Sequence, residues 1–136
     1  MSGVDATLVK LAVHVVEPMC DEENPSISRF DLGYAMGLIV GEGSFTGNRV
    51  TPVLSLKLHE LDPQPLRFLR RTLGGRIYGP YQHAGRHYRQ YFLRGHDLRE
   101  RIPLFLYHLP PSRKRLQFAE WAIRYRLLDA VNDDDG

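Results

Sequence analysis

The clearest pattern along the chain is a strict alternation of polar and apolar side chains over residues 51–59, TPVLSLKLH. Successive side chains of a β-strand point to opposite faces, so this alternation predicts a half-buried strand. A proline and three leucines occupy the side that is expected to face a core. The opposite and mostly polar side carries Thr51, Val53, Ser55, Lys57 and His59.

Helical patterns stand before and after this strand. Ser28 and Asp31 have the spacing of a capping box, and they open a predicted helix that runs to about Gly41. Residues 65–73 also have helical periodicity, and the two glycines that follow them are expected to end this second helix.

The second half of the chain repeats the order of strands and helices. Residues 76–81 and 87–94 are predicted strands joined by a QHAGR turn, and residues 96–109 and 112–130 are predicted helices separated by two prolines. The whole order predicts an α+β fold, αββαββα, with a four-stranded antiparallel sheet. Helices are expected on one face of the sheet, and the other face is expected to be bare.

Length and composition predict one folded domain with short extensions. The chain has 136 residues, and 43% of them are hydrophobic, which is enough for one core of ordinary size. We expect the domain at residues 29–130 and an acidic, disordered tail at 131–136. Residues 1–28 are expected to form an N-terminal extension and linker, in which residues 7–16 are either a strand or a short helix.

Cysteine content and hydropathy bear on the compartment. Cys20 is the only cysteine, so an internal disulfide is excluded, and a zinc site of the Cys-Cys type would need more thiols. The uncharged run at 32–41 has ten residues, where a membrane span needs about 20. We therefore expect a cytoplasmic protein, or one that accompanies DNA in an organelle or nucleoid, and not a secreted one.

The formal net charge of +2 conceals a strong segregation of charge. Residues 64–126 contain 14 arginines and lysines but only three acids, Asp97, Glu100 and Glu120. An excess of about eleven positive charges in one segment favours a polyanionic partner such as nucleic acid. The alternative is an arginine-rich surface that is merely solvated and is balanced by the acidic ends of the chain.

The predicted bare face of the sheet is rich in groups that could contact DNA. Arginine reads guanine and asparagine reads adenine when a β-ribbon lies in the major groove, although an exposed face is polar in any case. Candidate DNA contacts from the strand pattern and the adjoining turns are Thr46, Asn48, Arg49, Thr51, Ser55, Lys57, Arg76, Tyr78, Arg86, His87, Arg89 and Tyr91.

A glycine face and one carboxylate distinguish the first predicted helix. Gly33, Gly37 and Gly41 recur every four residues, and each costs about 1 kcal/mol relative to alanine in a helix interior. Small residues at this spacing let two helices approach closely, so we expect a dimer interface here, with packing inside the same domain as the alternative. Glu42 stands at the helix end, where the helix dipole repels a negative charge. Two such carboxylates at a helix crossing would repel each other, and bound cations would relieve that repulsion.

The stretch YAMGLIVGEGSF at residues 34–45 resembles the motif of the LAGLIDADG homing endonucleases, with GLI at 37–39 and GEGSF at 41–45 as the matching positions. The resemblance in element order covers roughly residues 30–128, and one copy of the motif is present. It implies a homodimer that pairs through the motif helix and binds double-stranded DNA with its sheet.

The resemblance also implies a catalytic site. Glu42 would bind Mg²⁺ or Mn²⁺, and Gly41 would add only a backbone carbonyl to the metal. Groups that orient water or neutralise charge would come from His59 or Glu60 and from the basic turn SRKR at 112–115, where Arg113 and Lys114 are the candidates. Val40 departs from the family pattern, which usually has aspartate at this position.

Three functions follow as hypotheses. The first is a homodimeric, metal-dependent DNA endonuclease of the homing type, with Glu42 as the deciding residue. The second is a DNA-binding protein of the same fold that no longer cuts, for which Val40 is the hint. The third is an intron-RNA-binding maturase, a role that some members of this family have.

Overall fold

A computed structural model of the chain describes residues 27–129. The segment at 7–16, the remainder of the predicted extension before residue 27 and the predicted acidic tail lie outside the described residues. The first described helix is α2, Arg29–Glu42. The hydroxyl of Ser28 accepts a hydrogen bond from the Asp31 backbone N–H at 3.1 Å, so the predicted helix start is confirmed.

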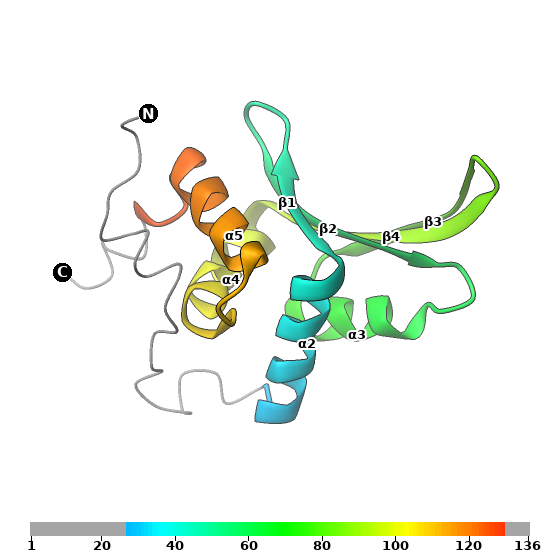
Figure 1. The fold of residues 1–136 in the computed structure, drawn as a ribbon, viewed down its shortest axis with the longest axis horizontal. Helices are drawn as coiled ribbons and strands as arrows, with labels where there is room; N and C mark the ends of the chain where they lie inside the picture. The colour runs from blue at the N-terminus through cyan, green and yellow to red at the C-terminus, as the bar shows by residue number, and fades with distance from the viewer. Residues whose placement is uncertain (1–26, 130–136) are drawn as a thin grey trace.

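Four antiparallel strands form one open sheet. The strands are β1 Gly43–Gly47, β2 Pro52–His59, β3 Arg76–His83 and β4 Arg86–Arg94. Their order across the sheet is β1-β2-β4-β3. The β1–β2 hairpin therefore lies beside the β3–β4 hairpin, with β2 and β4 in the centre. In Figure 1 the hairpin of β3 and β4 extends to the right beyond the helices. This arrangement confirms the α+β class and the antiparallel sheet.

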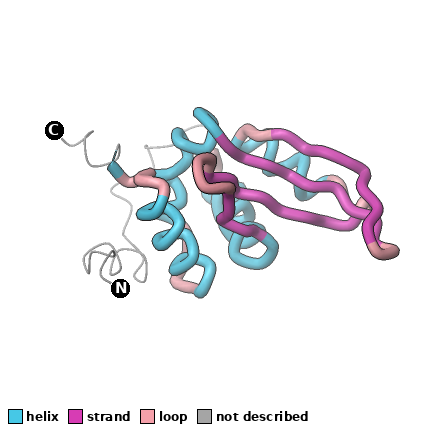
Figure 2. The backbone as a smooth tube through the Cα atoms, turned by 90° about the horizontal axis from the view of Figure 1, so that it is seen from above, coloured by secondary structure: helices cyan, strands magenta, loops and turns pink. Residues whose placement is uncertain are grey.

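Three further helices complete the described part of the chain. They are α3 Gln64–Leu73, α4 Gly95–His108 and α5 Arg113–Arg124. Together with α2 they leave one broad face of the sheet uncovered, which is visible when the sheet is seen from above in Figure 2. The face that the helices cover contributes Leu54, Leu56 and Leu93 to the core, all of them at most 1% exposed. The predicted leucine side of β2 is therefore confirmed.

Aromatic rings join the sheet to the last two helices. Phe45 on β1 lies 4.9 Å from Trp121 and 5.4 Å from Phe118, measured between ring centroids. The Trp121 indole N–H also donates to the Thr46 carbonyl at 2.7 Å. These contacts fix the strand that follows Glu42 against α5, and they therefore determine which basic residues of α5 reach that strand.

Two predicted element boundaries are wrong. The last helix was expected to run to residue 130, but α5 ends at Arg124, and Arg126 adopts a left-handed conformation with a φ of 57°. A helix cannot continue through that conformation. Strand β3 extends to His83, past its expected end at residue 81, because an irregularity between Tyr78 and Tyr81 absorbs Pro80 and pairing with β4 then resumes.

Candidate nucleic-acid interface

The exposed surface of α2 is the glycine face, formed by Gly33, Gly37 and Gly41. A Cβ atom built on any of the three would meet no atom within 4 Å among the described residues. Next to them Phe30 is 80% exposed and Tyr34 is 41% exposed. The alternative that these glycines allow close packing inside the described domain is therefore wrong. Their cost in helix stability has no compensation within residues 27–129.

Glu42 lies at the junction where α2 becomes β1, at one end of the glycine face. Both Gly41 and Glu42 are exposed, and in the described part of the chain the carboxylate has no hydrogen bond and no ion pair. The next residue makes the turn possible, because a Cβ on Gly43 would lie 2.7 Å from the Ile39 carbonyl oxygen. Glycine at position 43 thus lets the chain pass directly from helix to strand and leaves Glu42 projecting at the junction.

Lys114 reaches the same junction from the first turn of α5. Its ammonium group donates to the Gly43 carbonyl, one residue after Glu42, and to the Gln117 side-chain oxygen at 3.2 Å. The same oxygen of Gln117 accepts the Phe45 backbone N–H at 3.4 Å. The structure therefore brings two predicted site residues, Glu42 and Lys114, to one place. Gln117 was missed, and only its spacing of three residues from Lys114 on a helix could have suggested it.

The sheet register places His59 away from this junction. Gly43 pairs with Leu56, so Lys57 is the residue of β2 next to the junction, and His59 lies two positions further, roughly 7 Å along the strand. His59 instead ends its strand locally, since its Nδ1 accepts the Leu61 backbone N–H at 3.1 Å. Lys57, predicted as a DNA contact, is thus better positioned than His59 to act near Glu42.

The first turn of α5 carries three basic residues in succession, at 113–115. The positive end of the helix dipole lies at this turn and disfavours positive charge. Arg115 is fully buried, and its guanidinium donates to the Leu109 carbonyl and, at 2.8 Å, to the Leu106 carbonyl. It therefore caps the end of α4 and cannot contact phosphate, although the basic turn at 112–115 was expected to face DNA. Burial lowers the pKa of the Arg115 guanidinium from its ordinary value. Arg113 is exposed, so this predicted residue is accessible to a ligand.

Replacing Arg115 with alanine should destabilise the fold, because two buried carbonyls would lose a charged donor and a cavity would remain. We expect the free energy of unfolding to fall by about 3 kcal/mol in urea denaturation. Arg113→Ala removes an equal charge from an exposed neighbour and should change it by less than about 0.5 kcal/mol. Equal effects of the two substitutions would contradict the structural role of Arg115.

The open face is the sheet surface that no described helix covers. Side chains directly opposite each other in antiparallel strands share a face, so the pairing of the strands identifies its members. They are Ser44, Thr46, Val53, Ser55, Lys57, His59, Arg76, Tyr78, Tyr81, His83, Arg86, Tyr88, Gln90, Phe92 and Arg94. Six predicted DNA contacts belong to this set: Thr46, Ser55, Lys57, Arg76, Tyr78 and Arg86.

The predicted face of β4 is wrong by one residue. His87, Arg89 and Tyr91 were expected on the open face, but Tyr91 pairs with Leu56 and is 0% exposed. Its hydroxyl donates to the Gly74 carbonyl at 2.6 Å, and burial raises the pKa of Tyr91 above its usual range. Arg89 pairs with Leu58 and its Nε atom is buried, so neither residue presents its side chain on the open face.

The other predicted contacts lie at the edges of the sheet. His87 is partly exposed at the start of β4, with its Nδ1 4.0 Å from the Glu60 carboxylate. The side-chain oxygen of Asn48 accepts the backbone N–H groups of Val50 and Thr51, at 2.8 and 2.7 Å. That oxygen therefore shapes the β1–β2 turn and is not available to a base. Arg49 is exposed in the β1–β2 loop.

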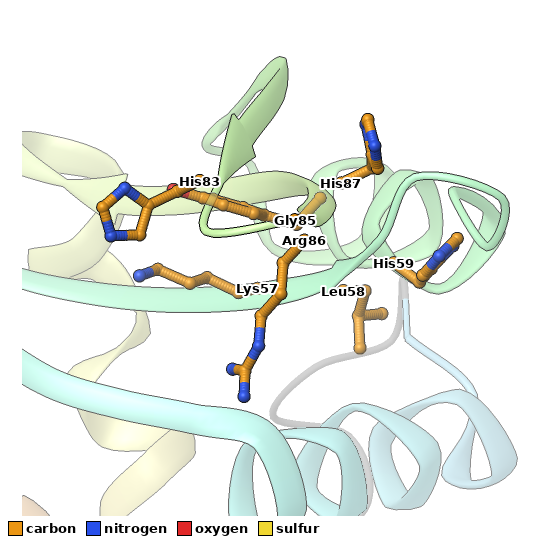
Figure 3. Close-up of a pocket in the computed structure, with 8 residues that line it drawn as sticks. Lys57, Leu58, His59, His83, Gly85, Arg86 and His87 are labelled. Atoms are coloured by element: carbon orange, nitrogen blue, oxygen red, sulfur yellow. The ribbon is translucent and has the colours of Figure 1, made fainter.

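A hollow of about 510 Å³ lies between the end of β2 and the β3–β4 hairpin. Figure 3 shows its lining, in which basic and imidazole groups gather from three strands and no acid takes part. The lining residues are Lys57, Leu58, His59, His83, Gly85, Arg86, His87 and Tyr88. A hollow with this lining suits an anionic group such as phosphate.

The donors at the α2–β1 junction fit a hard divalent cation only in part. The Glu42 carboxylate and the Gly41 carbonyl are oxygen donors of the type that Mg²⁺ prefers. Within residues 27–129, however, no three histidine, cysteine, aspartate or glutamate side chains come together as a metal site. A cation held at this junction would therefore need further oxygen ligands from outside the described residues.

Comparison with known proteins gives no family assignment. Neither the profiles of known protein families nor the curated proteins include a match to this sequence. Among the described helices, none is long and apolar enough to cross a membrane.

Proposed function

We propose that this chain is a divalent-metal-dependent DNA endonuclease of the LAGLIDADG homing type, which hydrolyses phosphodiester bonds as a homodimer. The observation that carries the proposal is Glu42, an exposed carboxylate without a partner among the described residues, at the end of an uncovered glycine face. The fixed ammonium of Lys114 beside it and the cationic open face of the sheet support the same function.

The proposed dimer brings two Glu42 side chains to one helix crossing. A two-fold axis along the glycine faces of two α2 helices would also place two copies of the open face side by side. Each copy would contact one half of a roughly palindromic site in double-stranded DNA. In this arrangement, further oxygen ligands for the cation would come from the partner and from the scissile phosphates.

Each residue at the junction has a separate part in the proposed cleavage. Mg²⁺ or Mn²⁺, when bound, would polarise the phosphate and lower the pKa of a water molecule. Glu42 and the Gly41 carbonyl would hold the cation, and Lys114 and Lys57 would offset the negative charge that develops on the phosphate oxygens. Arg113, exposed beside Lys114, would hold a neighbouring phosphate. His59, which lies two positions beyond Lys57 on β2, would contact the DNA backbone.

A DNA-binding protein that does not cut is the second candidate, and Val40 favours it. Val40 packs against the hydrophobic core, so it supplies no ligand at the junction. Among the described residues the junction therefore offers one acidic ligand per chain, which is the smallest set from which two chains could build a metal site.

Selection from a random DNA library separates these functions. The library is incubated with the protein in Mg²⁺ and, in parallel, without divalent cations, and the bound and the cut molecules are sequenced. Sites with two-fold symmetry that are cut only when Mg²⁺ is present support the endonuclease. Bound but intact sites under both conditions favour the binding protein, and RNA that displaces the selected DNA would favour the maturase.

Binding of the selected duplex should depend steeply on salt. Each phosphate neutralised by the protein lowers the logarithm of the association constant by about 0.9 for each tenfold rise in salt concentration. Lys57→Gln and Arg76→Gln, which alter the open face, should each reduce this slope by about one. Arg99→Gln removes an exposed charge from α4 and should leave it unchanged. A flat salt response of the wild type would contradict binding to nucleic acid.

A further inference from the structure

Four aromatic rings lie on the open face, on the neighbouring strands β3 and β4. Tyr81 pairs with Tyr88, and their ring centroids are 5.6 Å apart. Tyr78 and Phe92 form a second pair, with 5.5 Å between centroids. All four rings are on the side of the sheet opposite the core, so packing of the described domain does not explain them.

The rings remain accessible to a ligand. Tyr81 is 41% exposed, and the other three are half-buried by their neighbours on the same face. The two pairs follow each other along β3 and β4, and the hairpin that carries Tyr81 and Tyr88 projects beyond the helices. A ligand could therefore contact both pairs in succession along one line.

Cations flank each pair of rings. The Lys57 ammonium lies 5.2 Å from the Tyr88 ring centroid, and the Arg94 guanidinium lies 5.8 Å from that of Phe92. Arg94 also donates to the Tyr78 hydroxyl at 3.4 Å. Each pair borders a hollow, one of about 510 Å³ beside Tyr88 and one of about 220 Å³ that Tyr78 and Phe92 line with Arg76, Arg94 and a single acid, Asp97.

This alternation of rings and positive charges matches one class of ligand. A polynucleotide strand presents a planar base and a phosphate in each unit, so aromatic faces and cations recognise it together. A duplex offers base edges in its grooves, while the faces of its bases are stacked on one another. Only unpaired bases can stack on protein side chains.

We propose that the open face binds a single-stranded polynucleotide, with unpaired bases stacked on Tyr81, Tyr88, Tyr78 and Phe92 and with phosphates held by Lys57, Arg76 and Arg94. This binding goes beyond the cleavage of duplex DNA and does not require Glu42 or a metal. It uses the same surface as duplex binding, so the two ligands compete.

The test compares strands that differ only in their bases. Fluorescence anisotropy in EDTA measures the affinity for labelled oligothymidylate of about twelve nucleotides and for an abasic strand of equal length, which keeps the phosphates. We expect the strand with bases to bind at least about tenfold more tightly. Oligouridylate in a parallel arm shows whether an RNA strand binds as tightly as a DNA strand, and tight binding of either strand supports the proposal.

Substitutions assign this preference to the rings. Tyr81→Leu and Phe92→Leu keep an apolar side chain of similar reach but remove the aromatic face, and each should lower the affinity for the base-bearing strand about tenfold. Neither should change the affinity for the abasic strand. Tyr107→Leu is the control, because Tyr107 is also half-buried but lies on α4. Circular dichroism verifies that each variant is folded.

Three results would overturn the proposal. Equal affinity for base-bearing and abasic strands would show that the protein recognises only the charged phosphates. An equal loss of affinity for the base-bearing strand in Tyr107→Leu would show that the rings of the open face do not cause the preference. Binding of a duplex alone would assign these rings to contacts with thymine methyl groups and sugars. Because none of these assays measures cleavage, their failure would leave the proposed endonuclease function untouched, and the reverse also holds.

Discussion

Glu42→Gln should abolish DNA cleavage while leaving DNA binding intact. Glutamine keeps nearly the same shape as glutamate but lacks the charge that holds a hard cation. Without that cation, activation of water and polarisation of the phosphate are lost together, so we expect single-turnover cleavage in Mg²⁺ to slow by about a hundredfold to a thousandfold or more. Affinity for the selected duplex should be equal to that of the wild type or higher, because a negative charge near phosphate has been removed.

The matched control for this substitution is Glu120→Gln. Glu120 is an exposed acid on α5, so the control makes the same chemical change away from the α2–β1 junction and should cleave at the wild-type rate. Ca²⁺ in place of Mg²⁺ should support binding but little cleavage, because its coordination is larger and less rigid. Equal cleavage rates for wild type and Glu42→Gln would remove Glu42 from the mechanism. If neither protein cuts any selected site, the chain is a binding protein.

The charge of Glu42 at its helix end is not compensated by the helix itself, because the last turn of α2 contains no basic residue. The cation that the fold brings to this junction is Lys114, whose ammonium contacts the Gly43 carbonyl. Such a contact spans 71 residues in sequence, and spacing rules cannot predict it.

Local signals in the sequence predicted much of the fold. The Ser28 cap, the leucine side of β2 and the glycine stop after α3 depend on neighbouring residues, and the structure confirms all three. The face of β4 was different, because HYRQYFLR carries polar and aromatic residues on both sides. Its only leucine, Leu93, must lie in the core with Leu54, and this residue alone could have assigned Tyr91 to the core.

The candidate site was less predictable, because it depends on the register between strands. The sequence identified Glu42, Lys114 and the polar side of β2. It placed His59 or Glu60 in the catalytic site and Lys57 only among the DNA contacts, because the pairing of Gly43 with Leu56 is set by the β1–β2 turn and by packing of Phe45 on α5. Arg115 was indistinguishable from Arg113 in sequence, and only burial against the α4 carbonyls separates their roles.

Gly37→Leu should separate the proposed dimer into monomers without destabilising the fold. A leucine at a close helix crossing would push the two backbones apart, and we expect the dissociation constant of the dimer to rise about ten- to a hundredfold. Within one chain the substitution meets no steric obstacle, because a Cβ at position 37 has no neighbour within 4 Å among the described residues. Glycine is also the poorer helix former by about 1 kcal/mol relative to alanine. The thermal midpoint of the monomer should therefore stay equal or rise.

A weaker dimer together with an equal or higher thermal midpoint would show that position 37 lies in a contact surface. A packing defect inside the monomer would instead lower the thermal midpoint. Sedimentation velocity over a range of concentrations measures the dimer, and thermal denaturation at low concentration measures the monomer. Arg99→Leu adds the same side chain to the exposed surface of α4 and should leave the dimer intact. Gly37→Leu should cut DNA only at concentrations that restore the dimer, because one Glu42 cannot complete the metal site alone. A wild-type protein that stays monomeric on a selected DNA site would exclude the two-fold arrangement, and with it the reason for a glycine face that ends at a carboxylate.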